Sequence, residues 1–450
     1  MMRRRDAGVT ERHFKSNTFI YIYDSKYLVR LSGTEPRAWD LIGRFESLGG
    51  FLQSTEQGDG GTEGPGPKEK AVLVGKLWKA KALELDEGDI RDLAGWILRF
   101  TLEDLTGQEG GSPGNPAAGR DAWQTLWDDA EGSGRVVRCH LELTYRCNLR
   151  CRHCYNPEIP QTELDTAEMK RIIAQLRDRG CLFITFTGGE PFVRRDFPEL
   201  LRYARESGLV ASVSTNGSLV TRAKAELLRD FDLLSVDVSL YGLSREAYAR
   251  VTGNGAAYAQ VLAGIEALRD AGVNVFVKFI VTRDTWRDAP SFGRLLDSLS
   301  VQGIVHWPRL FPRQDGGRFP LTLRLTDEEL SELLAGGVLK PPARKGRCFA
   351  GSTRLRISPE GKLYPCEFLP IELGDLRAEP LGDVLRQHFE NNSVFSRNPR
   401  LFSPAECDGC GVKAFCYRCP ALAFAETGNL ETASSEACRV AHLVAPASRG

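Results

Sequence analysis

The stretch VRCHLELTYRCNLRCRHC, residues 137–154, places three cysteines directly behind a strand-like pattern. Apolar and polar side chains alternate over its first eight residues, which is the period of a half-buried β-strand. The spacing C-x3-C-x2-C then sets Cys147, Cys151 and Cys154 in the segment that follows. The sequence therefore predicts a cysteine loop at the C-terminal end of a strand.

Three closely spaced thiolates leave a metal centre with one open position. Structural zinc normally completes its tetrahedron with a fourth protein ligand. A 4Fe–4S cluster held by three cysteines instead leaves one iron free to bind and activate a small molecule. For the cysteines taken alone, a zinc knuckle or a structural thiol cluster is the alternative.

A second motif follows the next predicted strand. The apolar run that begins at Cys181 ends in Thr187-Gly188-Gly189-Glu190-Pro191. Two glycines allow close approach of the backbone to a ligand, and Glu190 adds a carboxylate. An amino group bound at the open iron can donate to this segment.

The two motifs together resemble the radical S-adenosylmethionine (SAM) superfamily. In that family the three cysteines hold a 4Fe–4S cluster, and the amine and carboxylate of SAM chelate the fourth iron. The resemblance implies that Gly188, Gly189 and Glu190 bind the methionyl amine. It also implies that His153, where many members carry Tyr, lies near the adenine.

Strand and helix patterns alternate downstream of the cysteine loop, which argues for a parallel sheet. The expected strands are 137–144, 182–187, 209–214, 233–240, 273–282 and 303–307, and the expected helices are 165–179, 196–207, 222–228, 257–271 and 290–299. The resemblance implies a partial (β/α)6 TIM-like barrel, with its site at the C-terminal strand ends. The residues that it implies for the ribose and carboxylate of SAM are Ser214, Asn216, Asp237 and Ser239, with Lys278 and Arg309 as further candidates. Ordinary turns are the alternative for these strand ends.

Seven of the twelve cysteines lie after residue 340. Strand patterns at 355–358 and 362–364 flank the turn Pro359–Gly361, and this hairpin would bring Cys348 and Cys366 to the same side. The others are Cys407, Cys410, Cys416, Cys419 and Cys438. Upstream, Cys139 and Cys181 lie within predicted strands, where buried thiols are expected.

This cysteine-rich tail resembles the SPASM extension of radical SAM enzymes, which normally holds two auxiliary 4Fe–4S clusters. The resemblance assigns Cys348, Cys366 and Cys419 to the first auxiliary cluster, whose fourth ligand is unknown. It assigns to the second cluster Cys407, Cys410, Cys416 and Cys438. The chain departs from the family pattern because two residues, not three, separate Cys416 and Cys419. A closed zinc ribbon is the alternative for the 407–419 cysteines.

The N-terminal region has a different pattern. Residues 19–23 and 27–31 read as a β-hairpin, and helices are expected at 34–48 and 89–105. This order resembles the PqqD-like element of peptide-maturing enzymes, in which a leader peptide adds as a strand to a sheet edge. A purely structural extension is the alternative.

The expected architecture is therefore an α/β chain of three domains. These are a winged-helix-like α+β recognition domain (1–120), a radical SAM core (121–318) and a Cys-rich SPASM domain (319–450).

Bulk properties exclude some classes of partner. Lys plus Arg and Asp plus Glu both number 59, which gives no electrostatic case for nucleic acid or an anionic membrane. The basic start Met1–Asp6 has no apolar stretch behind it, unlike a signal peptide. No apolar run reaches the roughly 18 residues of a membrane span. Twelve cysteines without an export signal predict metal binding in the cytoplasm.

The resemblance implies an oxidoreductase that uses SAM and three 4Fe–4S clusters. A low-potential donor, flavodoxin or ferredoxin, would reduce the first cluster, and cleavage of SAM would release a 5′-deoxyadenosyl radical. The expected substrate is a ribosomally synthesised precursor peptide (RiPP biosynthesis), in which a thioether or C–C crosslink forms. The alternatives are an enzyme acting on a haem precursor or a protein side chain, as sulfatase-maturing relatives do, and a non-catalytic Fe–S electron-transfer or regulatory protein.

Overall fold

The computed structural model describes short strands between residues 3 and 84, and then residues 135–158, 162–339, 350–390, 401 and 403–447. The chain forms two compact units, Met1–Arg135 and Val136–Gly450. Within the described part of the chain, no helix combines the length and apolar character that a membrane crossing requires.

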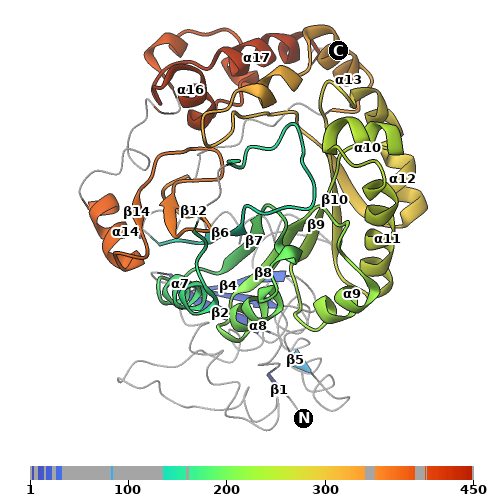
Figure 1. Ribbon diagram of the computed structural model, residues 1–450. Helices are drawn as coiled ribbons and strands as arrows, with labels where there is room; N and C mark the ends of the chain where they lie inside the picture. The colour runs from blue at the N-terminus through green and yellow to red at the C-terminus, as the bar shows by residue number, and fades with distance from the viewer. Residues whose placement is uncertain are drawn as a thin grey trace, which may run out of the picture. The chain divides into compact units, whose positions relative to one another are not determined.

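The second unit is built on one nine-stranded sheet, in the order β11-β10-β9-β8-β7-β6-β12-β13-β14 (Figure 1). Its parallel strands are β6 (Arg138–Thr144), β7 (Phe183–Gly188), β8 (Val210–Thr215), β9 (Ser235–Leu240), β10 (Val275–Ile280) and β11 (Gln302–His306). Each of these strands pairs with the next one along the chain. This is the usual result when a short crossover connection places consecutive strands side by side. The predicted partial barrel is confirmed.

Helices cover the outer face of these strands (Figure 1). They are α7 (Thr166–Asp178), α8 (Phe197–Glu206), α9 (Arg222–Arg229), α10 (Arg245–Thr252), α11 (Ala257–Asp270) and α12 (Phe292–Leu299). Their apolar faces pack on alternate strand residues such as Leu141, Phe186 and Val213, which are fully buried. The sequence analysis did not predict α10, although it has local signals: Ser244 caps its start and Gly253, with φ of 74°, ends it.

The C-terminal hairpin extends the barrel sheet. Strands β12 (Arg354–Ile357) and β13 (Lys362–Tyr364) pair antiparallel, which confirms the predicted hairpin. Beyond this prediction, β12 also pairs parallel with β6, and Leu355 lies opposite Cys139. The remaining elements are β14 (Gly374–Asp375), α13 (Asp327–Ala335), α14 (Leu381–Glu390), α16 (Pro420–Thr427) and α17 (Ser435–Ala447).

The first unit contains a three-stranded antiparallel sheet, β2-β3-β4. Strands β3 (Asn17–Ile22) and β4 (Tyr27–Ser32) form the expected hairpin, and β2 (Val9–Phe14) adds a strand that was not predicted. The short strands β1 (Arg3–Arg4) and β5 (Leu83–Glu84) pair separately. The helices expected at 34–48 and 89–105 lie outside the described residues.

Candidate functional site

The two glycines at the end of β7 lie against the start of the cysteine loop. Gly189 N donates to Thr144 O at 2.6 Å, and Glu190 N donates to Arg146 O at 3.0 Å. A Cβ on Gly188 would lie 2.4 Å from Thr144 O, and one on Gly189 would lie 2.4 Å from Arg146 O. Gly188 also has φ of 122°, a conformation that favours glycine. Glycine is therefore required at both positions because their backbone lies against the backbone of Thr144 and Arg146.

Glu190 joins the ends of two strands. Its side chain is fully buried and accepts hydrogen bonds from Thr215 Oγ1 at 2.8 and 2.9 Å, Asn216 N at 2.8 Å and Phe192 N at 3.1 Å. Burial raises the pKa of Glu190, and these hydrogen bonds act in the opposite direction. The carboxylate thus organises the site from within. Thr215 was not among the predicted site residues, although it stands beside Asn216 and directly follows a predicted strand.

Asn216 connects the end of β8 to the cysteine loop. Its Nδ2 donates to Asn148 Oδ1 at 2.9 Å and lies 3.7 Å from Cys147 Sγ. Leu149 N points at the same sulfur from 3.4 Å. Such N–H groups stabilise a thiolate and influence the potential of a cluster that it holds. Asn216 is therefore placed to act on Cys147 directly.

The three cysteines have the chemistry that an iron–sulfur cluster needs. Cys147 is exposed, and Cys151 and Cys154 are half-buried. Burial raises the pKa of all three thiols, that of Cys154 to about 11, so binding of soft metal ions is what would deprotonate them. Among the described residues, no three Cys, His, Asp or Glu side chains meet at one ion position. A cubane has no such requirement, because each thiolate binds its own iron.

An aromatic pair lies beside the loop. The His153 ring is 4.9 Å from the Tyr241 ring, and burial lowers the pKa of His153 to about 4, which keeps it neutral at pH 7. A hydrogen bond between Tyr241 and Cys151 partly opposes the effect of burial on that thiol. Tyr241 was not among the predicted site residues, although it directly follows β9.

The other predicted SAM contacts lie on neighbouring strands. Ser214 of β8 is opposite Asp237 of β9, and Ser239 is opposite Lys278 of β10. Lys278 Nζ lies 2.5 Å from Asp237 Oδ2, and Ser235 Oγ donates to Asp237 Oδ1 at 2.8 Å. The structure therefore brings these residues together, with Asp237 already paired to a cation.

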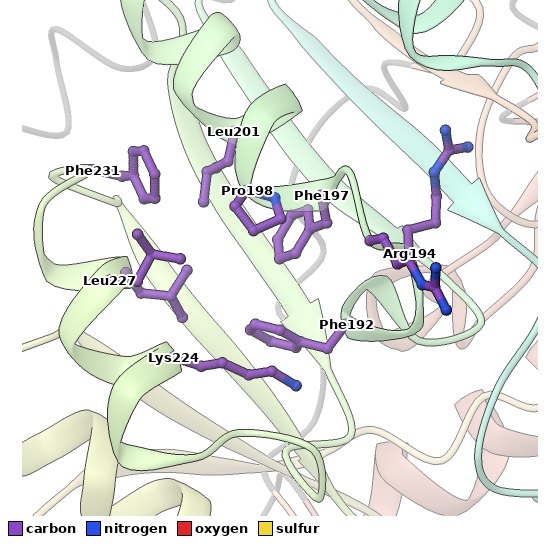
Figure 2. Close-up of a pocket in the computed structure, with 10 residues that line it drawn as sticks. Phe192, Arg194, Phe197, Pro198, Leu201, Lys224, Leu227 and Phe231 are labelled. Carbon is purple, nitrogen blue, oxygen red and sulfur yellow. The ribbon is translucent and has the colours of Figure 1, made fainter.

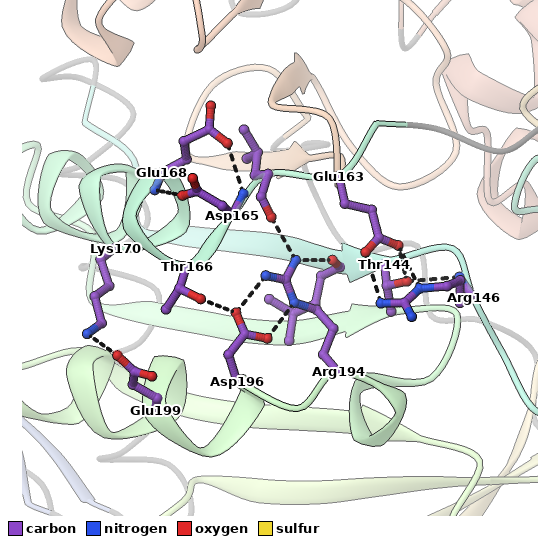
Figure 3. A network of polar contacts seen from close by, with 12 residues as sticks. Thr144, Arg146, Glu163, Asp165, Thr166, Glu168, Lys170, Arg194, Asp196 and Glu199 are labelled. Atoms are coloured by element: carbon purple, nitrogen blue, oxygen red, sulfur yellow. Dashed lines mark hydrogen bonds and ion pairs between the residues drawn. The ribbon is translucent and has the colours of Figure 1, made fainter.

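Arg194 links the end of β6 to the residues just before α7 through hydrogen bonds (Figure 3). Its Nη1 donates to Leu143 O at 2.9 Å and to Leu164 O at 3.1 Å. Its Nη2 and Nε donate to Asp196, and Thr166 donates to the same carboxylate at 2.7 Å. Hydrogen bonds from Arg194 lower the pKa of Asp196 to about 2. This part-buried network holds the strand that leads into the cysteine loop.

A small cavity lies between α8 and α9 (Figure 2). Its volume is about 160 Å³, and most of its lining is apolar, with Phe192, Leu201 and Phe231 on its walls. Its lining residues include none of the described cysteines. It is therefore separate from the cysteine loop.

Six of the seven C-terminal cysteines lie in the described part of the chain. Burial raises the pKa of Cys416 and Cys438, and the nearby thiols of Cys407 and Cys410 raise both further. Cys366 belongs to a small core with Leu369 and Leu401, against which both Cys416 and Cys419 pack. The division of these cysteines between two clusters stays a prediction. Cys348, the third residue of the first auxiliary set, lies outside the described residues.

Comparisons with known proteins agree with this geometry. Residues 141–290 match the model of the radical SAM superfamily, and residues 348–411 match that of the SPASM iron-sulfur cluster-binding domain. The PqqA peptide cyclase of Rhodopseudomonas palustris is 29% identical over 341 residues, which are 70% of this chain and 89% of that protein. The AdoMet-dependent heme synthase of Methanosarcina barkeri is 28% identical over 331 residues, which are 64% of this chain and 92% of that protein.

Among solved structures, Streptococcus suis SuiB bound to S-adenosylmethionine has a similar fold. The TM-score is 0.56 at 15% identity, over 97% of this chain and 100% of that one. The cofactors are iron–sulfur clusters and SAM, which the cysteine sets fit. With both domains matched in order along one chain, this protein is a member of the radical SAM superfamily that carries a C-terminal SPASM domain.

Proposed function

We propose that this radical SAM/SPASM enzyme modifies a ribosomally synthesised precursor peptide and forms a thioether or C–C crosslink in it. The observation that carries the proposal is the sheet β2-β3-β4 of the first unit. Among the described strands, β2 and β4 each pair on one side only. A leader peptide can add as a further strand to such an edge.

Relatives support a peptide as substrate. The PqqA peptide cyclase is one, and the subtilosin biosynthesis protein AlbA of Bacillus subtilis is 27% identical over 300 residues, which are 62% of this chain and 66% of that protein. The SuiB fold has also been solved with its precursor peptide SuiA.

In the proposed reaction, the chain's own residues bind, orient and exclude water. Cys147, Cys151 and Cys154 would hold the SAM-binding cluster, which when bound supplies the electron for cleavage of SAM to a 5′-deoxyadenosyl radical. His153 and Tyr241 offer ring faces for the adenine. The residues proposed for the rest of SAM are Gly188, Gly189, Glu190, Ser214, Asn216, Asp237 and Ser239. A low-potential flavodoxin or ferredoxin would deliver the electron.

Coexpression with a precursor peptide encoded beside this protein tests the substrate. We expect mass spectrometry to find a peptide that has lost two hydrogens, because oxidative crosslinking removes them. The matched control is coexpression of the Cys151→Ala variant, which should leave the peptide mass unchanged. An unmodified peptide, together with turnover of a haem precursor by the purified enzyme, would contradict the proposal. A haem precursor is the second substrate in this test because the chain is also similar to heme synthases.

Removal of residues 1–120 tests the proposed recognition domain. We expect the shortened protein to bind the leader peptide at least about tenfold more weakly, because the sheet edge is lost. SAM cleavage should change far less, since the proposed radical SAM core (121–318) and SPASM domain (319–450) remain. Leader affinity by fluorescence anisotropy and 5′-deoxyadenosine by chromatography are the measurements. Equal leader affinity in both proteins would refute the recognition role.

Iron analysis tests the proposed auxiliary sets. We expect anaerobically reconstituted protein to bind about twelve irons, because three cubanes contain four each. The proposed ligands are Cys348, Cys366 and Cys419 for the first set and Cys407, Cys410, Cys416 and Cys438 for the second. Cys410→Ala should lower the iron content by about four, whereas Cys181→Ala, in a β-sheet core, should not change it. About four irons in the unaltered protein would contradict both sets.

A further inference from the structure

A buried ion pair joins the C-terminal hairpin to the strand that leads into the cysteine loop. Arg356 Nη1 of β12 lies 3.0 Å from Glu142 Oε2 of β6, and the two side chains are 1% and 0% exposed. The Arg356 guanidinium also lies 3.8 Å from the centre of the Tyr364 ring in β13. An arginine from the SPASM region is thus held inside the radical SAM core.

The contacts continue from this pair to both ends of the cysteine loop. Tyr145, two residues before Cys147, donates its hydroxyl to Glu142 Oε2 at 2.9 Å. The same hydroxyl lies 3.1 Å from Gln314 Oε1. The backbone N of Gln314 donates to the backbone O of Tyr155 at 2.8 Å, and Tyr155 directly follows Cys154. Gln314 therefore touches the loop on both sides.

Stability alone is a poor reason for this arrangement. Replacement of a buried ion pair by well-packed apolar side chains is often neutral or stabilising, whereas removal of one partner leaves an uncompensated charge. The best-attested use of such a pair is to select one arrangement of the chain over others. Here the pair, with the Tyr145 hydroxyl, selects one position for the start of the cysteine loop relative to β12.

We propose that Arg356 is a positioning residue through which the SPASM domain orders the SAM-binding loop. Arg356 holds Glu142, Glu142 holds Tyr145, and Gln314 ties Tyr145 to Tyr155 at the far end of the loop. SAM then binds to a loop that is already ordered. Less conformational entropy is lost on binding, because the loop does not have to be ordered at that step. This role is independent of the substrate and goes beyond the proposed peptide chemistry.

The test measures SAM binding to three variants of the reconstituted, full-length protein under anaerobic conditions. Tyr145→Phe removes one hydroxyl and leaves the buried ion pair in place. Arg356→Gln removes the cation. Arg377→Gln is the matched control, because Arg377 also joins the C-terminal region to the core, through Glu168 of α7 at 3.3 Å and Glu163 O at 3.0 Å. Its described contacts do not include Glu142, Tyr145 or Gln314, the residues through which Arg356 is proposed to act.

The readouts are the Kd for SAM from equilibrium dialysis and the change that SAM causes in the electron paramagnetic resonance spectrum of the reduced protein. We expect Tyr145→Phe to raise the Kd about threefold to tenfold, the effect of one lost hydrogen bond. Arg356→Gln should raise it further, and Arg377→Gln less than about twofold. Tyr145→Phe and Arg356→Gln should also broaden or shift the SAM-dependent electron paramagnetic resonance signal. A merely structural role would leave that signal unchanged.

Two results would overturn the proposal. One is wild-type SAM affinity and spectrum in Tyr145→Phe, which decides the matter even if Arg356→Gln fails to fold. The other is an equal loss in Arg377→Gln, which would mean that any weakened contact between the two regions acts alike. Neither result depends on whether the substrate is a peptide, because SAM itself is the probe.

Discussion

Cys151→Ala is expected to abolish the formation of 5′-deoxyadenosine from SAM in the presence of dithionite. The variant leaves two thiolates in the loop, and a cubane held by two residues at this site loses its anchoring and its defined open iron. Cys139 and Cys181 cannot replace Cys151, because they are fully buried within the strand and helix core. We expect at least about a thousandfold loss, measured by chromatography of the reaction products.

The matched control for this experiment is Cys181→Ala. Cys181 Sγ lies 3.3 Å from Phe183 O and 3.6 Å from Val137 O, contacts in which a thiol is only a weak donor. Its loss should lower stability slightly and leave SAM cleavage close to that of the unaltered protein. Persistent 5′-deoxyadenosine formation by Cys151→Ala would refute the assignment of the SAM-binding cluster.

Glu190→Ala is expected to have the second largest effect. The truncation leaves three buried donors, the hydroxyl of Thr215 and the N–H groups of Asn216 and Phe192, without their acceptor. Each unpaired buried group costs about 1–3 kcal/mol, so the free energy of unfolding should fall by about 3 kcal/mol or more. Because Asn216 also contacts Cys147, SAM cleavage should fall as well, by about a hundredfold or more.

Two further variants separate the causes. Glu190→Gln keeps one acceptor oxygen but turns an amide N–H toward a backbone donor, so it should lose less stability than Glu190→Ala. Glu199→Ala removes a carboxylate that is 55% exposed and pairs with Lys170, and it should change neither stability nor activity measurably. Denaturant unfolding and 5′-deoxyadenosine assays check both. Wild-type values for Glu190→Ala would show that the buried carboxylate does not organise the site.

The local patterns of the sequence predicted most of the barrel correctly. Alternation of apolar and polar residues marked β6, and short apolar runs marked its neighbours, because both patterns depend only on the strand itself. Spacing alone set Cys147, Cys151 and Cys154 in one loop. The helix α10 was not predicted, because its apolar face is short and only Ser244 and Gly253 clearly signal its ends.

Roles that depend on packing could not be predicted in this way. The two glycines also lie against the backbone of Thr144 and Arg146, a contact that no local pattern indicated. The carboxylate of Glu190, whose contact with SAM stays a prediction, accepts hydrogen bonds from β8 and the loop after it. Such partners are chosen by how two strand ends meet, and no local period encodes that.

The sequence by itself therefore determined the parallel strands and the cysteine loop, because strand patterns and thiolate spacing act over a few residues. The cofactors followed from the resemblance that these motifs carry. Tertiary structure alone decided that β12 pairs with β6 and that Arg356 meets Glu142 across 214 residues of chain. The physical reason is that strand partners and buried ion pairs are selected by the shape and polarity of the assembled core. That selection exists only once distant segments have been packed together.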